Sequence, residues 1–117
     1  MKALKSVKIA SGGSQSEAVD LEHYELAGLI MPSAWTAAAI TLLAADGPNA
    51  TFAQVVDDAG TELSITVAAS QIIGIGTEVK QGAVRALKWV KLRSGTAGVP
   101  VNQAADRTIH LLLTRVG

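Results

Sequence analysis

The chain contains no cysteine and few aromatic residues. Its 117 residues include no Cys, one Tyr, one Phe and two Trp. The lack of cysteine excludes disulfides, thiolate metal sites and cysteine nucleophiles. With so few aromatic rings, a core must be built mainly from Ala, Val, Leu and Ile. A chain of this length buries roughly two-thirds of the surface of its unfolded form, so we expect one core without covalent cross-links.

An excess of charge and long apolar runs are also lacking. Ten basic residues balance ten acidic ones, so the formal net charge is zero. Nonspecific binding to nucleic acid requires a basic surface, and we therefore expect no nucleic-acid partner. The longest apolar-looking run, residues 35–45, falls short of the ~20 residues that span a bilayer. We expect no membrane segment, and the polar residues near the start of the chain argue against a signal peptide.

What the chain does contain is a series of short segments in which apolar and polar residues alternate. A period of two is typical of β-strands that bury one face. Such segments, separated by turn-forming residues, are 18–21, 24–31, 37–45, 52–56, 63–67, 71–75, 89–93 and 108–116. Seven or eight short strands predict an all-β fold, an antiparallel β-sandwich or jelly roll.

The segment 33–45 is ambiguous. Its alanines and a capping serine, Ser33, favour a helix, whereas the alternation of Ile40, Leu42 and Ala44 favours a strand. We predict a short turn followed by a strand, because the neighbouring segments alternate by two. A hairpin with Gly60 in the left-handed position is expected between residues 52–56 and 63–67. Residues 77–82 are expected to form a polar connection.

Residues 1–16 are expected to lie outside the main domain. Within them, residues 11–16 read SGGSQS, which is the composition of a flexible linker. We predict that residues 1–16 form an arm held by a neighbouring subunit. Residues 17–117 would then form a single β-sandwich domain.

No residue pattern specifies a reaction. The two histidines, His23 and His110, lie in no motif that predicts a neighbouring nucleophile, so we expect no enzymatic activity. Acidic residues near the predicted turns lack the spacing of an EF-hand calcium loop: Asp46, Asp57, Asp58 and Glu62. Turn formation accounts for aspartates at such positions, and no metal or cofactor is expected.

The clearest candidate for a binding surface follows the strand at residues 89–93. Glycine, serine and proline interrupt the alternation there, and a polar run precedes the strand that begins at residue 108. A long ordered loop between two strands commonly carries the partner contacts of a small β-domain. The two arginines that flank this loop would offer bidentate hydrogen-bond donors. We predict partner contacts by Arg93, Ser94, Thr96, Asn102, Gln103 and Arg107.

Three stretches of the sequence together resemble a known family. They are LIMPSAWTAAAITLLAADG, VVDDAGTE and VKLRSGTAGVPVNQAADRTIHL, and they are similar to small structural proteins of tailed phages and prophages. The resemblance covers most of the chain from about Val19 onward. It implies a non-enzymatic virion component built as a β-sandwich. Its partners would be the major capsid protein or other virion subunits, together with further copies of the chain in a trimer.

We therefore expect a structural component of a bacteriophage virion, specifically a capsid decoration (cement) protein that binds the shell through its arm and loops. The alternative is a carbohydrate-binding module or a receptor-binding fibre domain. In that case Trp35 or Trp89 would be exposed beside polar groups and would stack against sugar rings.

Overall fold

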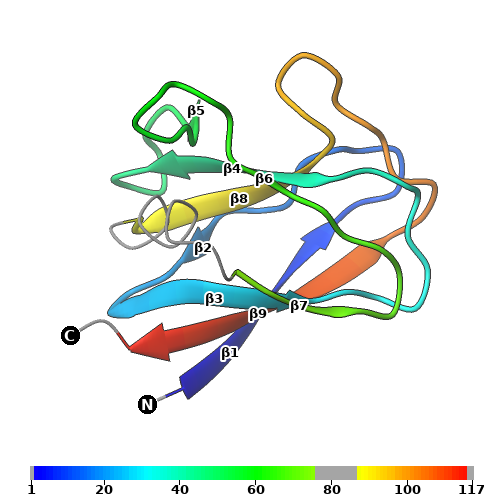
Figure 1. Cartoon of the computed structure of the whole chain (residues 1–117), viewed down its shortest axis with the longest axis horizontal. Coiled ribbons are helices and arrows are strands. Elements are labelled where there is room, and N and C mark those ends of the chain that lie inside the picture. Colours follow the sequence, from blue (N-terminus) through cyan, green and yellow to red (C-terminus); the bar gives the residue numbers. More distant parts are fainter. Residues whose placement is uncertain (1, 76–86, 116–117) are drawn as a thin grey trace.

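The computed structural model describes residues 2–75 and 87–115, which form nine β-strands and no helix (Figure 1). The strands are β1 (Lys2–Ile9), β2 (Val19–Asp20), β3 (Tyr24–Ile30), β4 (Ile40–Ala45), β5 (Ala53–Gln54), β6 (Ser64–Ile65), β7 (Ile72–Gly74), β8 (Trp89–Ser94) and β9 (Arg107–Arg115). All the pairings are antiparallel. The prediction of an all-β, antiparallel fold is confirmed. The ninth strand is β1, which lies in the segment predicted to be an arm.

The strands form two sheets in which the two halves of the chain pair with each other. The first sheet, here the β1 sheet, has the order β1-β9-β3-β7. The second, the β4 sheet, has the order β2-β8-β4-β5, and β6 also pairs with β4. The pairs β1–β9, β2–β8, β3–β7 and β4–β5 are nested. The chain therefore follows the path of one long hairpin whose two arms are wound into both sheets.

The core takes side chains from both sheets. On β9, Ile109, Leu111 and Leu113 are at most 2% exposed, whereas His110 and Thr114 are half-buried on the opposite face, as the alternation predicts. Leu42 of β4 and Leu92 of β8 are fully buried on the other side of the core. Full burial of one such side chain contributes about 1.5–3 kcal/mol, so this aliphatic core stabilises the chain without large aromatic residues.

The prediction that residues 1–16 form an arm outside the domain is wrong, because strand β1 belongs to the β1 sheet. It pairs with β9 along its whole length, from Lys2 opposite Thr114 to Ile9 opposite Arg107. Val7 and Ile9 are buried in the core, since they alternate with exposed residues and so occupy the inner face of the sheet. The following turn is also tied to the domain, because the backbone N–H of Gly12 donates to the carbonyl of residue 103 at 2.8 Å. Residues 2–16 are therefore part of the domain.

The predicted strand in the ambiguous segment is confirmed, since β4 occupies Ile40–Ala45. The predicted turn after β5 is also confirmed: Gly60 has a φ of +82°, and the backbone N–H of Asp57 donates to the carbonyl of Thr61 at 2.9 Å. The predicted hairpin is confirmed next to this turn, where Val56 forms an antiparallel bridge with Glu62 and the backbone N–H of Leu63 donates to the carbonyl of Val55 at 2.9 Å. The longer hairpin strands differ from the prediction, because β5 and β6 both pair with β4 and run in the same direction. Residues 56–63 loop out between them. The connection predicted at 77–82 lies outside the described residues.

Candidate interaction site in the loop after β8

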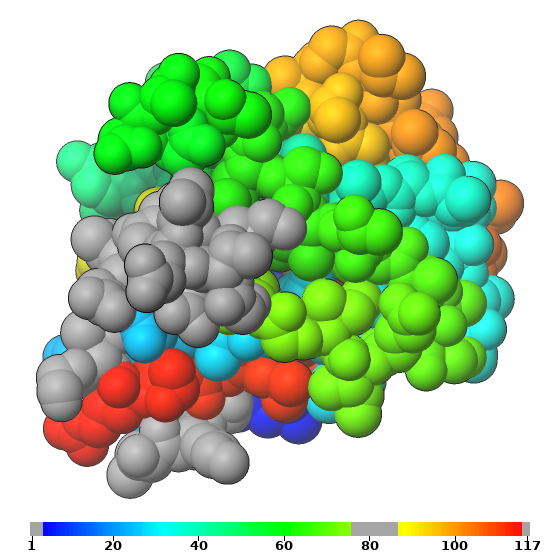
Figure 2. Space-filling model, viewed as in Figure 1, coloured from blue at the N-terminus to red at the C-terminus, as the bar shows by residue number. Residues whose placement is uncertain are grey.

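Residues 95–106, the β8–β9 loop, project as a lobe at the upper edge of the molecule in Figure 2. The loop begins with a tight turn in which Gly95 has a φ of +90° and forms a bridge with Pro100. Inside this turn, the backbone N–H of Val99 donates to the hydroxyl of Thr96 at 3.1 Å. The side chain of Val99 is nevertheless 69% exposed. The turn is thus ordered by its own hydrogen bonds and presents an apolar tip.

The second part of the loop is fixed by the buried side chain of Gln103, which is 1% exposed. Its amide nitrogen donates to the hydroxyl of Ser94 at 2.7 Å and to the carbonyl of Thr36 at 3.0 Å. Its amide oxygen accepts from the backbone N–H of Thr36 at 2.9 Å and from Nε of Arg107 at 3.2 Å. Gln103 therefore joins the loop to the end of β8, to the start of β9 and to the segment before β4.

The first part of the loop is fixed by Arg93, which lies on the outer face of the β4 sheet. Its Nε donates to Oγ1 of Thr41 at 3.0 Å, and its guanidinium group forms an ion pair with Glu62. The hydroxyl of Thr41 donates in turn to the carbonyl of Gly95 at 2.7 Å. The Glu62 carboxylate also accepts a bond from the backbone N–H of Ala97 at 3.2 Å. This network locks the turn onto two other segments.

The structure corrects the expected environment of Arg93. The alternation along β8 predicts that Arg93 meets water, yet its side chain is only 8% exposed. The reason is that residues 56–63 fold over this part of the β4 sheet and supply Glu62 as a partner. Burial of a guanidinium group is costly unless it is paired, and here the carboxylate and the Thr41 hydroxyl provide that pairing.

The residues predicted to contact a partner therefore divide into two groups. Side chains that are buried and bonded within the chain are Arg93, Ser94 and Gln103, and they shape the loop instead of facing a partner. Side chains that are at least partly exposed are Thr96, Asn102 and Arg107. Val99 is not among the residues predicted from the sequence, although an apolar residue within a polar loop is a signal that could have identified it.

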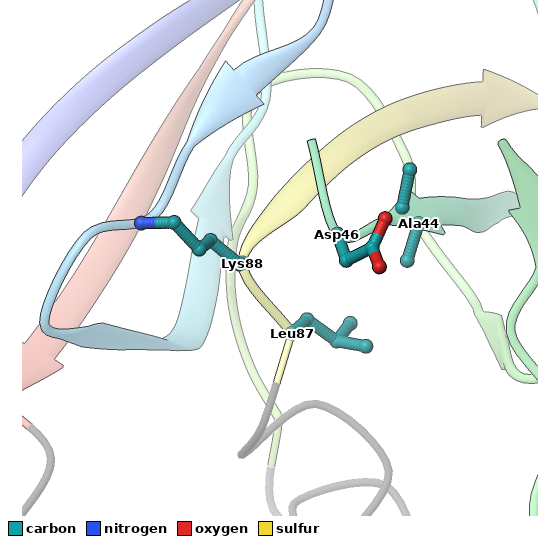
Figure 3. A pocket seen from close by; sticks show the side chains of 5 residues that line it. Ala44, Asp46, Leu87 and Lys88 are labelled. Carbon is teal, nitrogen blue, oxygen red and sulfur yellow. The ribbon is translucent and has the colours of Figure 1, made fainter. Parts of the chain in front are cut away.

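A shallow pocket of about 270 Å³ lies beside the end of β4 (Figure 3). It is lined by Ala44, Ala45, Asp46, Leu87 and Lys88. The side chain of Lys88 extends away from Asp46 in Figure 3, and its Nζ lies 3.4 Å from a carboxylate oxygen of Asp20. The lining therefore brings no acid and base together, and it does not support a catalytic role.

The described part of the chain contains neither a cluster of side chains that could hold a metal ion nor a helix that could cross a membrane. There, no group of three or more His, Cys, Asp or Glu side chains is placed to hold a metal ion. Asp57 instead accepts hydrogen bonds from the backbone N–H groups of Ala59 at 2.9 Å and Thr61 at 3.0 Å. No helix among the described residues is long and apolar enough to cross a bilayer.

The tryptophans do not form an exposed stacking platform. Trp35 is half-buried against the core, and its indole N–H donates to the carbonyl of Ala38 at 3.0 Å. Trp89 is also half-buried. The exposed, ordered β8–β9 loop is thus the best candidate for a functional surface. Comparisons of the chain with models of protein families, with curated proteins and with solved structures find no match.

Proposed function

We propose that this chain is a structural component of a tailed-bacteriophage virion, a capsid decoration protein that binds the shell through its β8–β9 loop and acts without catalysis. The observation that carries the proposal is the combination of an exposed apolar tip and a buried polar base in one loop. Val99 is 69% exposed, whereas Gln103, at the base, is 1% exposed. Such a surface suits a protein that works by occupying a site in an assembly.

The ordered base matters for the free energy of binding. A flexible loop loses conformational entropy when a partner immobilises it, and this loss weakens the complex. Hydrogen bonds donated by the Gln103 amide and accepted by the Glu62 carboxylate already restrict the β8–β9 loop in the free chain. Burial of the Val99 side chain by a partner would then contribute its hydrophobic free energy with little further ordering cost.

The fold gives independent support. We infer that the two sheets form a β-sandwich of the jelly-roll type, because the nested pairs β1–β9, β2–β8, β3–β7 and β4–β5 are those of a rolled hairpin. Jelly rolls are common in viral capsid proteins and also in lectins. The fold therefore supports the assignment to virion structural proteins. The β8–β9 loop supports binding to the shell through an exposed apolar tip.

The sequence resemblance to virion proteins fits the same proposal. Two parts of the third similar stretch, LRSGT and PVNQAADR, contain Arg93, Ser94, Gly95, Gln103 and Arg107. These residues fix the base of the β8–β9 loop. A family that uses this loop to bind a shell would need to keep these residues together.

The test is binding to capsids of the phage or prophage that encodes the chain, prepared without this protein. Wild-type chain should co-sediment with the capsids, and Val99→Asp should weaken binding at least tenfold, because it places a charge in the apolar contact. Thr51→Asp is the matched control, since Thr51 is also a β-branched residue and is exposed on a different loop. Wild-type binding by Val99→Asp, or failure of the wild-type chain to bind capsids, would overturn the proposal.

A further inference from the structure

Both edges of the β1 sheet carry a large exposed apolar side chain on the same face. Leu4 of β1 is 57% exposed and Ile72 of β7 is 73% exposed. In the register of the sheet, Leu4 lies in a row with Leu112, and Ile72 lies in a row with Ile30 and His110. Since the neighbouring positions Val7 and Ile109 point into the core, these rows lie on the outer face.

The backbone of β1 also has free hydrogen-bonding groups at its edge. Lys8 donates its backbone N–H to the Glu17 carboxylate at 3.3 Å, away from β9. Because successive residues of a strand direct their N–H and C=O groups to opposite sides, Leu4 and Ser6 also direct theirs outward. Ile9, at the end of β1, forms a bridge with Ser16, but no described residue pairs with Leu4 or Ser6 on this side of the strand.

The edge formed by β7 has the same property. Residue 71 accepts a bond from the backbone N–H of Met31 at 2.8 Å, and Ile75 donates to the carbonyl of Ala27 at 2.9 Å. Odd-numbered residues of β7 therefore face β3, and Ile72 and Gly74 direct their backbone groups outward. No described residue pairs with these groups on the outer side of β7.

We propose that copies of this chain join edge to edge, with β7 of one copy adding to β1 of the next. Strand directions alternate across the sheet in the order β1-β9-β3-β7, so β7 of a second copy would run antiparallel to β1 and continue the same pattern. Ser6 would then pair with the second copy's Ile72, and Leu4 with its Gly74. Leu4 and Ile72 would become diagonal neighbours and cover each other.

The charge and shape of the two edges favour this contact over a contact between identical edges. Two β1 strands would bring together the lysines at positions 5 and 8 of both copies. By contrast, β7 carries no charged residue. A Cβ atom at Gly74 would meet nothing within 4 Å, so this position leaves room for the side chain of Leu4.

A contact between two different edges is head-to-tail, and repetition of it gives a ring or an open filament. A ring of three copies requires a rotation of about 120° at each contact. The inference rests on the self-association within the proposed function and assigns it to two named edges. It involves neither Val99 nor the β8–β9 loop, so failure of the edge contact and failure of capsid binding are distinguishable.

Because the chain has no cysteine, single cysteines can test the contact directly. Ser6→Cys and Ile72→Cys would be prepared separately, mixed and oxidised. Cα atoms of a hydrogen-bonded antiparallel pair lie about 5.5 Å apart, which is within the range of about 4.4–6.8 Å found across disulfides. We expect a disulfide dimer that contains one copy of each variant, at least fivefold above the yield from a mixture of Ser6→Cys and Thr51→Cys, since Thr51 is exposed on a different loop.

Each outcome decides the proposal. A dimer from Ser6→Cys alone, or from Ile72→Cys alone, would show contact between identical edges and would overturn it. A yield from the mixture no greater than that of the control would also overturn it. The double variant Ser6→Cys/Ile72→Cys should form longer covalent chains, and a product that stops at three copies would identify a closed trimer. Light scattering of Ile72→Lys should give the mass of a single chain at concentrations where the wild-type protein is oligomeric.

Discussion

The side-chain amide of Gln103 donates a 2.7 Å hydrogen bond to the hydroxyl of Ser94, and both side chains are buried. Ser94 is the last residue of β8, so this bond closes the β8–β9 loop at its base. The same glutamine also binds both backbone groups of Thr36. One side chain therefore determines where the exposed tip of the loop can lie.

Replacement of Gln103 by leucine should lower the free energy of unfolding by about 2–4 kcal/mol. Leucine has a similar size but leaves the buried groups of Ser94 and Thr36 unpaired, and each unpaired group costs about 1–3 kcal/mol. Urea unfolding followed by tryptophan fluorescence would measure the change. The exposed neighbour Asn102 provides the control: Asn102→Leu should change stability by less than about 0.5 kcal/mol. Equal effects of the two variants would contradict this prediction.

Replacement of Glu62 by glutamine should destabilise the chain by about 1–3 kcal/mol. The change keeps the shape of the side chain but leaves the charge of Arg93 buried without its counterion, which is costly. In the exposed pair of Lys8 and Asp106, the charged atoms lie 3.9 Å apart, so Lys8→Gln should cost at most about 1 kcal/mol. The comparison is made by thermal or urea unfolding at two salt concentrations. A larger loss for Lys8→Gln would contradict the assignment of Arg93–Glu62 as the stabilising pair.

Substitution of Gly95 by alanine should distort the β8–β9 loop. Its φ of +90° is unfavourable for alanine, and a Cβ atom there would collide with the backbone of Val99 and Val101. We expect a loss of at least about 1–3 kcal/mol together with weaker capsid binding. At Gly98 a Cβ atom would meet nothing within 4 Å, so Gly98→Ala should retain both properties. Wild-type stability of Gly95→Ala would show that the turn is not fixed as described.

The stability of the chain should depend on Asp20 at acidic pH. The pKa of the Asp20 carboxyl is lowered, chiefly because the carboxylate accepts a hydrogen bond from the backbone N–H of Glu22 at 2.8 Å. Desolvation raises this pKa in part, whereas Lys88 and Lys5 lower it further. A lowered pKa in the folded state stabilises the fold above the unfolded pKa of about 4, and this stability is lost as the pH falls through the folded pKa. The stability difference between wild type and Asp20→Asn should therefore shrink between pH 5 and pH 2. A constant difference over that range would contradict the prediction.

Alternation of apolar and polar residues predicted β3, β4, β7, β8 and β9, because alternate residues of each strand face the core. The same local rule could not show which strands pair. Pairing of β1 with β9 joins the two ends of the chain, so it depends on contacts that no short window of sequence contains. For this reason residues 1–16 resembled an arm, although Val7 and Ile9 carry the alternation of a strand.

The sequence by itself determined the all-β character, the aliphatic core and the position of the loop after β8, because these properties follow from residue type and local periodicity. The tertiary structure alone decided the roles of Arg93, Ser94 and Gln103, since burial depends on segments that arrive from elsewhere in the chain. Glu62 reaches Arg93 from a loop 31 residues away, and Thr36 reaches Gln103 across 67 residues. Hydrogen bonds and an ion pair with these distant residues make Arg93 and Gln103 internal supports of the β8–β9 loop.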